Sequence, residues 1–134
     1  MSLSFEKKKT IKMKPNLILA KQKFKAGIKA HISQQYEKAI QLYDEAIGVN
    51  PNYSLAYSNK GISLDELGRK NEAIKCYDRA ITINPRFVDA YVNKGTVLNE
   101  MGNNIDSIKC YDQAIQIDPK YTGAYYNKGN ALKC

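Results

Sequence analysis

The sequence of 134 residues contains no tryptophan, one histidine and three cysteines, and these scarcities exclude several kinds of site. His31 is remote in sequence from Cys76, Cys110 and Cys134, and the four residues show none of the paired spacings of a metal site. Paired carboxylates, a glycine loop for phosphate and a nucleophile beside a base are also missing. We therefore predict a protein that is not an enzyme, with no cofactor and no metal, and with free thiols that indicate a reducing compartment.

Long apolar stretches are absent as well. No run approaches the roughly 18 apolar residues of a membrane span. The lysine-containing start lacks the apolar segment of a signal peptide. These two absences predict a cytoplasmic protein.

Negative charge is scarce only near the N-terminus. Residues 1–30 contain nine lysines and one glutamate, a difference of +8 that equals the net charge of the whole chain. We interpret residues 1–14 as a basic tail without regular structure, because they show no sustained helical period. The first helix is expected to begin at Pro15, since proline is tolerated in a first turn.

The sequence matches itself when it is shifted by 34 positions. Seventeen of the 34 residues in 54–87 recur unchanged in 88–121. The recurrence extends toward both ends of the chain, with prolines at 51, 85 and 119, glycines at 27, 61, 95 and 129, and tyrosines at 43, 77 and 111. A fixed period of this length is typical of a repeat array.

Each unit contains two stretches in which apolar and small residues have helical spacing. The residues of 54–87 that carry this spacing are Tyr57, Gly61, Leu64, Ala73, Tyr77 and Ala80. A short turn at Gly68 separates the two helices, so they are expected to be antiparallel. Glycine in a helix costs about 1 kcal/mol relative to alanine, so we expect close approach of the partner helix at Gly61. Such helix pairs bury their apolar faces only by stacking, which predicts an all-α solenoid.

These positions resemble the tetratricopeptide repeat (TPR) family, whose pattern is matched by Tyr57, Gly61, Leu64, Ala73, Tyr77, Ala80 and Pro85. The resemblance implies a right-handed superhelical solenoid of about 3.5 repeats and seven helices. The repeat domain would span residues 15–134, with repeats at about 20–53, 54–87 and 88–121 and a half repeat at 122–134. The family's usual leucine is replaced by Lys60, Lys94 and Lys128, whose stems are expected to cover the helix interface while their ammonium groups reach water.

The resemblance further implies a non-enzymatic scaffold for protein–protein interaction, which binds a peptide or a partner helix in a concave groove. Carried over position by position, the groove residues are Phe24, Ile28, Leu55, Asn59, Ile62, Val92, Asn93, Thr96, Tyr126 and Asn127. This mixture of apolar and polar side chains is typical of an interaction surface.

One subset of the family binds the C-terminal carboxylate of heat-shock chaperones with a clamp of two lysines, two asparagines and an arginine. Only Asn59 matches that clamp, and its cation positions are occupied here by Phe24, Asp89 and Asn93. A buried carboxylate would lack its partners, so this ligand is not expected. Asn59, Asn93 and Asn127 instead resemble the asparagine ladder of O-linked N-acetylglucosamine transferases, which grips peptide backbone. Asparagines that were merely copied with the repeat would give the same pattern, and both interpretations remain open.

Two other functions are alternatives. The lysine-rich N-terminus could dock on RNA or on an anionic membrane surface, although nucleic acid is disfavoured because no stacking aromatics are interleaved with the lysines. The chain could also be the interaction domain of a larger enzyme. The half repeat at 122–134 either caps the array or has lost its second helix to truncation. If its apolar residues Tyr125 and Leu132 are left uncovered, a homo-oligomer is expected to form through them.

Overall fold

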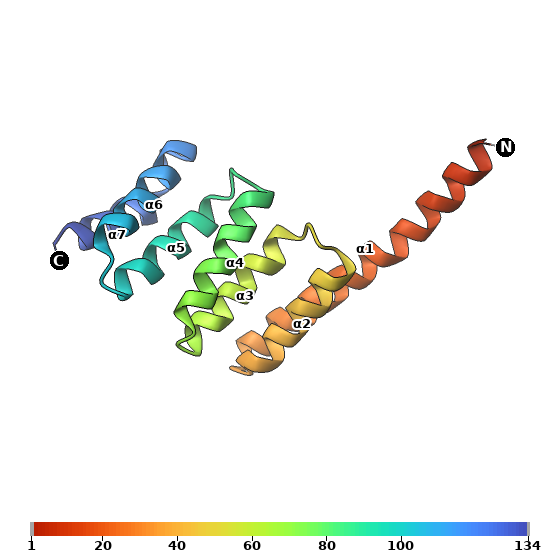
Figure 1. The fold of residues 1–134 in the computed structure, drawn as a ribbon, viewed down its shortest axis with the longest axis horizontal. Helices are drawn as coiled ribbons and strands as arrows, with labels where there is room; N and C mark the ends of the chain where they lie inside the picture. The colour runs from red at the N-terminus through yellow and green to blue at the C-terminus, as the bar shows by residue number, and fades with distance from the viewer. Residues whose placement is uncertain (1, 134) are drawn as a thin grey trace.

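The structure is a computed structural model that describes the backbone of residues 2–133 and the side chains of residues 16–133. Within these residues it contains seven α-helices and no strand, which confirms the predicted all-α fold. The helices are α1 (Ser2–Ile32), α2 (Tyr36–Val49), α3 (Ser54–Glu66), α4 (Lys70–Ile83), α5 (Val88–Glu100), α6 (Asn104–Ile117) and α7 (Thr122–Leu132). Successive helices pack on one another along one direction, so the two termini lie at opposite ends of the solenoid (Figure 1).

Helix α1 begins at Ser2, so the expected start at Pro15 and the expected unstructured tail are wrong for the backbone. Its N-terminal part projects away from α2 and the other helices (Figure 1). Residues 2–14 contain no glycine and several lysines, which are good helix formers. Pro15 removes one internal hydrogen bond, and the helix continues past it.

In each of the first three repeats, the turn between the two helices contains one residue in the left-handed backbone conformation. The short turn predicted at Gly68 is one of them. Gly68 and Gly102 have φ angles of 76° and 83°, which glycine adopts without steric cost. Gln34 occupies the same place in the first repeat with φ of 61°. A side chain in this conformation costs roughly 1–2 kcal/mol, so the first turn is strained relative to the other two.

The core repeats one contact between a glycine and a tyrosine. Gly27, Gly61 and Gly95 face Tyr43, Tyr77 and Tyr111, and each of these tyrosines is 1% exposed. A Cβ atom added at these glycines would lie only 2.5–2.7 Å from a ring carbon. The close helix approach predicted from the mid-helix glycines is therefore present in all three complete repeats. Buried alanines such as Ala73 and Ala80 fill the remaining space between the helices.

Neighbouring repeats are joined by a recurring ion pair. Lys60, Lys94 and Lys128 each bind an aspartate of the preceding helix, Asp44, Asp78 and Asp112, with Nζ–Oδ1 distances of 2.6 Å. The expectation that these ammonium groups simply reach water therefore needs correction. Burial lowers the pKa of Lys60, but the hydrogen bond and charge of Asp44 outweigh it, and the net pKa is raised. Lysine at the usual leucine position thus connects two repeats.

Candidate functional site

The expected groove residues come from α1, α3, α5 and α7, where the 34-residue period places them on one face. We call this the groove face. Leu55 and Tyr126 are exposed, at 48% and 73%, and Val92 is 7% exposed. The other seven are half-buried: Phe24, Ile28, Asn59, Ile62, Asn93, Thr96 and Asn127. Most of the face is therefore partly open to a ligand.

A small pocket on the groove face lies between the first two repeats. Its lining residues are Ile28, His31, Tyr43, Asn59 and Ile62, and its volume is about 60 Å³. The structure thus brings together Ile28, Asn59 and Ile62 of the ten groove residues named above, and it adds His31 and Tyr43. His31 lies three positions after Ile28, and this spacing places both side chains on the same face of α1. The spacing is the sequence signal that could have identified His31 as a pocket residue. Its Nδ1 atom lies 2.9 Å from Ser63 Oγ, and its ring meets Tyr36 edge-on at 5.1 Å.

Asn59 is tied to the scaffold as well as facing the groove. Burial raises the pKa of Tyr43, and a side-chain hydrogen bond with Asn59 lowers it in part. An asparagine amide has two N–H donors and an acceptor oxygen. The amide therefore has bonding capacity for a ligand beyond its interaction with Tyr43.

Phe24 and Val92 contribute less free surface than the sequence predicts. The Phe24 ring lies between Tyr43 and Tyr53, at centroid distances of 5.9 and 5.0 Å. Val92 belongs to a buried cluster that includes Tyr111 and Ala124. Neighbouring side chains therefore cover part of Phe24 and most of Val92, which leaves less of both for contact with a ligand.

Thr96 is also held by the scaffold. Its hydroxyl lies 3.0 Å from the carbonyl oxygen of Val92 and 3.1 Å from the Tyr111 hydroxyl. Because the single proton of the Thr96 hydroxyl is donated to Val92, the Tyr111 hydroxyl donates the second hydrogen bond. Thr96 therefore helps to hold Tyr111, whose ring packs against Gly95 within the third repeat.

Charged side chains on the groove face differ between repeats. Lys21 and Lys25 are exposed on α1. On α5, Asp89 accepts a hydrogen bond of 2.9 Å from the hydroxyl of Tyr121. The position that holds a cation in the chaperone clamp thus carries a carboxylate that is already bonded to a tyrosine.

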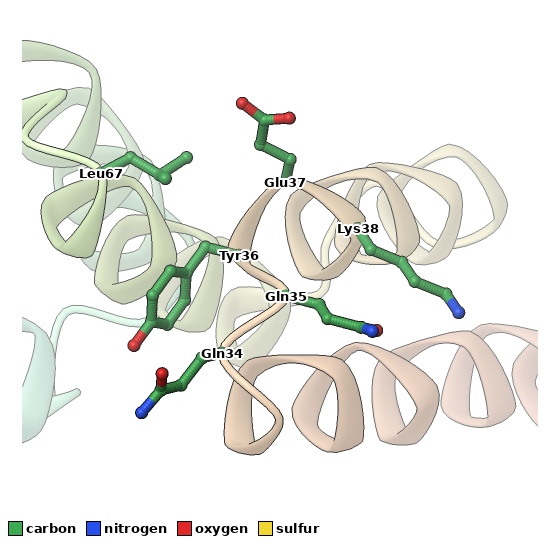
Figure 2. A pocket seen from close by; sticks show the side chains of 6 residues that line it. All are labelled: Gln34, Gln35, Tyr36, Glu37, Lys38 and Leu67. Atoms are coloured by element: carbon green, nitrogen blue, oxygen red, sulfur yellow. The ribbon is translucent and has the colours of Figure 1, made fainter.

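A larger cavity of about 430 Å³ lies at the turn between α1 and α2 (Figure 2). Its lining residues are Gln34, Gln35, Tyr36, Glu37, Lys38 and Leu67. Figure 2 shows that Glu37 and Lys38 point away from Gln34 and Tyr36, so the polar groups do not converge on one point. We find no arrangement there that would hold a specific ligand.

Reactive chemistry is not indicated by the part of the chain whose side chains are described. No group of three histidine, cysteine or acidic residues gathers there as a metal site. Cys76 and Cys110 are free, as predicted, and both are buried. Cys134 lies outside the described residues. Burial raises the pKa of both thiols, which makes them poor nucleophiles. None of the described helices is long and apolar enough to cross a membrane.

Comparisons with solved structures agree with this architecture. The TPR domain of Arabidopsis OM64 is 23% identical with a TM-score of 0.85, over 88% of this chain and 98% of that chain. MamA is 28% identical with a TM-score of 0.81, over 94% of this chain and 72% of that chain. The first TPR of Spaghetti (RPAP3), bound to the HSP90 peptide SRMEEVD, is 17% identical with a TM-score of 0.82, over 86% of this chain and 91% of that chain.

Family models match most of the sequence, whereas no curated protein matches it. Tetratricopeptide repeat models match residues 30–53, 54–87 and 76–109, and a TPR repeat model matches residues 95–133. These matches together cover residues 30–133, which contain α2 to α7 and the end of α1. The chain belongs to the tetratricopeptide repeat family.

Proposed function

We propose that this chain is a non-enzymatic protein-interaction scaffold that binds an extended peptide along the groove face. Domains of this family are protein-interaction modules and are generally not enzymes. Among proteins with a similar fold, the Spaghetti domain is bound to an HSP90 peptide, and the TPR2B domain of yeast Sti1 is in complex with pHsp70. The observation that carries the proposal is the pocket between Ile28, Asn59 and Ile62, which combines apolar walls with an amide group.

The three asparagines would be spaced to meet every third residue of an extended peptide. Asn59, Asn93 and Asn127 are half-buried at equivalent positions of α3, α5 and α7. Packed helices lie about 10 Å apart, and an extended chain advances about 3.3 Å per residue. One amide would therefore meet every third ligand residue and could bond its N–H and C=O without reading its side chain.

Selectivity would come from the apolar neighbours of this asparagine row. The pocket of about 60 Å³ beside Ile28 and Ile62 suits a small aliphatic side chain. Leu55 and Tyr126 offer exposed apolar surface farther along the face. Burial of such groups contributes roughly 25 cal/mol per Å² of apolar surface, before the cost of ordering the peptide.

An acidic chaperone C-terminus is not the ligand that this groove favours. Phe24 and Asp89 occupy cation positions of the clamp, and Phe24 is packed between two tyrosine rings. A second carboxylate beside Asp89 would be repelled rather than neutralised. The peptide SRMEEVD is therefore expected to bind weakly or not at all.

The test uses peptides selected from a random displayed library against the chain, with affinity measured by fluorescence polarisation. Replacing Asn59, Asn93 and Asn127 together by alanine should weaken binding by roughly 10-fold to 2000-fold, from about 0.5–1.5 kcal/mol for each hydrogen bond. Circular dichroism should show an unchanged helix content. Lys75→Ala, on the exposed side of α4, is the matched surface control.

Tyr43→Phe tests how much the Tyr43 hydroxyl contributes, because it removes the group that interacts with Asn59 and keeps the buried ring. Peptide affinity should fall less than with Asn59→Ala, since the amide keeps its own donors and acceptor for the ligand. Equal affinity of the triple variant and the wild type would refute the asparagine row. Tight binding of SRMEEVD would refute the proposed selectivity.

A further inference from the structure

His31 lines the pocket between the first two repeats, and two neighbouring helices hold its ring there. Its Nδ1 atom lies 2.9 Å from Oγ of Ser63 on α3. Its ring meets the Tyr36 ring of α2 edge-on, with the ring centroids 5.1 Å apart. The imidazole is therefore held from α2 and from α3, and its orientation beside the pocket is fixed.

Ser63 decides which nitrogen of this imidazole carries the proton. Ser63 is 0% exposed, so its hydroxyl proton needs an acceptor inside the protein. A helical hydroxyl can donate to the carbonyl oxygen four residues earlier, as Thr82 and Thr96 do here. Ser63 makes no such bond within the described residues, and its hydrogen-bond partner is Nδ1 of His31. The serine therefore donates to Nδ1, and the neutral ring carries its own proton on Nε2.

This assignment leaves the Nε2–H group of His31 available to a ligand. The two nitrogens of an imidazole point in different directions, so Nε2 does not face Ser63. No hydrogen bond within the described residues uses Nε2. Nor is Nε2 shut inside the protein, because the buried side-chain atoms without a partner in this part of the chain comprise only Asn99 Oδ1. A donor is thus open beside an apolar pocket.

The residue at the position of His31 differs from repeat to repeat, whereas the asparagine row is constant. The equivalent residues of the second and third repeats are Asp65 and Asn99. Asp65 already accepts a hydrogen bond from Lys70, with an Nζ–Oδ1 distance of 2.7 Å. The oxygen of Asn99 is buried. An imidazole donor beside a pocket therefore distinguishes the first repeat from the next two.

We propose that His31 determines the register and part of the specificity of the bound peptide, by donating Nε2–H to a ligand oxygen beside the small aliphatic side chain in the pocket. This inference rests on the proposed function. The asparagine row alone would bind the same peptide equally well after a shift of one repeat, because its amides are equivalent. The donor of His31 occurs once, so only one register pairs it. A ligand that covers Nε2–H without an acceptor leaves this donor unpaired, which lowers its affinity.

The test must separate the Nε2 donor from the support that His31 gives to Ser63. His31→Phe alone keeps a ring against Tyr36 but leaves the buried Ser63 hydroxyl without its acceptor, which destabilises the fold. We therefore compare Ser63→Ala with the double variant His31→Phe/Ser63→Ala, in which neither protein retains that hydroxyl. Circular dichroism should show the same helix content in both.

The probes are peptides selected on the wild-type chain from a random displayed library, with affinity measured by fluorescence polarisation. The double variant should bind them roughly 2-fold to 10-fold more weakly than Ser63→Ala does, which is the effect of one hydrogen bond between neutral groups. Alanine replacement of the ligand residues beside the aliphatic one then locates the acceptor. If the difference between the two proteins disappears, the acceptor is a side-chain oxygen, and if it persists, the acceptor is a backbone carbonyl.

Asn59→Ala is measured with the same peptides, so that failure of this inference can be told from failure of the proposed function. Weaker binding by Asn59→Ala together with equal binding by Ser63→Ala and the double variant would overturn the role of His31 alone. Equal binding by the wild type and all three variants would overturn the groove face as the binding site as well.

The register is tested by photo-cross-linking. A benzophenone group at one fixed position of the peptide should label a single repeat of Ser63→Ala. In the double variant it should also label the neighbouring repeat, because the donor that distinguishes the registers is gone. Labelling confined to the same repeat in both proteins would overturn the role of His31 in the register.

Discussion

The same substitution at two equivalent glycines should have opposite effects on stability. Gly95→Ala and Gly129→Ala both replace a helical glycine, which gains about 1 kcal/mol of helix propensity. At Gly129 nothing lies within 4 Å of the new Cβ atom, so the full gain should remain. At Gly95 the Cβ atom would lie 2.7 Å from Cε1 of Tyr111 and 3.0 Å from two further ring atoms.

The cost at Gly95 follows from how firmly the ring is held. Carbon atoms in contact are ordinarily about 3.5–4.0 Å apart, so Tyr111 must shift by nearly 1 Å. The ring is 1% exposed, and its hydroxyl is hydrogen-bonded to Thr96 at 3.1 Å, so it has little room to retreat. Overpacking of this kind costs about 1–3 kcal/mol. The propensity term cancels between the two variants, so their free energies of unfolding should differ by about that amount.

Urea unfolding followed by circular dichroism, in dilute protein where self-association is negligible, measures this difference. For a chain of this size about 1 kcal/mol corresponds to roughly 3–5 °C in Tm, so thermal unfolding gives a second reading. Gly95→Leu should be at least as destabilising as Gly95→Ala. Identical shifts for Gly95→Ala and Gly129→Ala would refute the idea that tyrosine packing is what requires glycine.

Two further predictions concern the first turn and alkaline pH. Gln34→Gly should stabilise the chain by about 1 kcal/mol, because glycine relieves a φ angle of 61°, while Gly68→Gln should cost a similar amount; thermal unfolding of both variants checks the pair. Burial raises the pKa of Tyr77 above its usual value of 10.0, so the folded state holds this proton more firmly than the unfolded state. The contribution of this protonated tyrosine to the free energy of unfolding is therefore complete below about pH 10 and is lost as pH rises further. Tyr77→Phe should lose less stability in that alkaline range, and parallel losses in both proteins would contradict this assignment.

The sequence alone determined the repeat and its packing. The glycine and tyrosine of each contact are 16 residues apart, for example Gly61 and Tyr77, and such contacts recur with a fixed period. In a solenoid each helix meets only its neighbours, so local pattern specifies most of the core. The all-α architecture, the stacked repeats and the close approach at the mid-helix glycines could therefore be predicted without coordinates.

Only the tertiary structure decided features that depend on what a neighbouring helix presents. The period places Phe24 and Val92 in equivalent registers on the groove face, yet Tyr53 lies against the first and Ala124 belongs to the cluster around the second. The structure likewise shows Lys60 paired with Asp44 across a repeat boundary. A period fixes direction around a helix axis, whereas burial also depends on the size and charge of the side chain opposite. That is why the sequence could assign positions to one face of the helices but not say which of those side chains remain exposed.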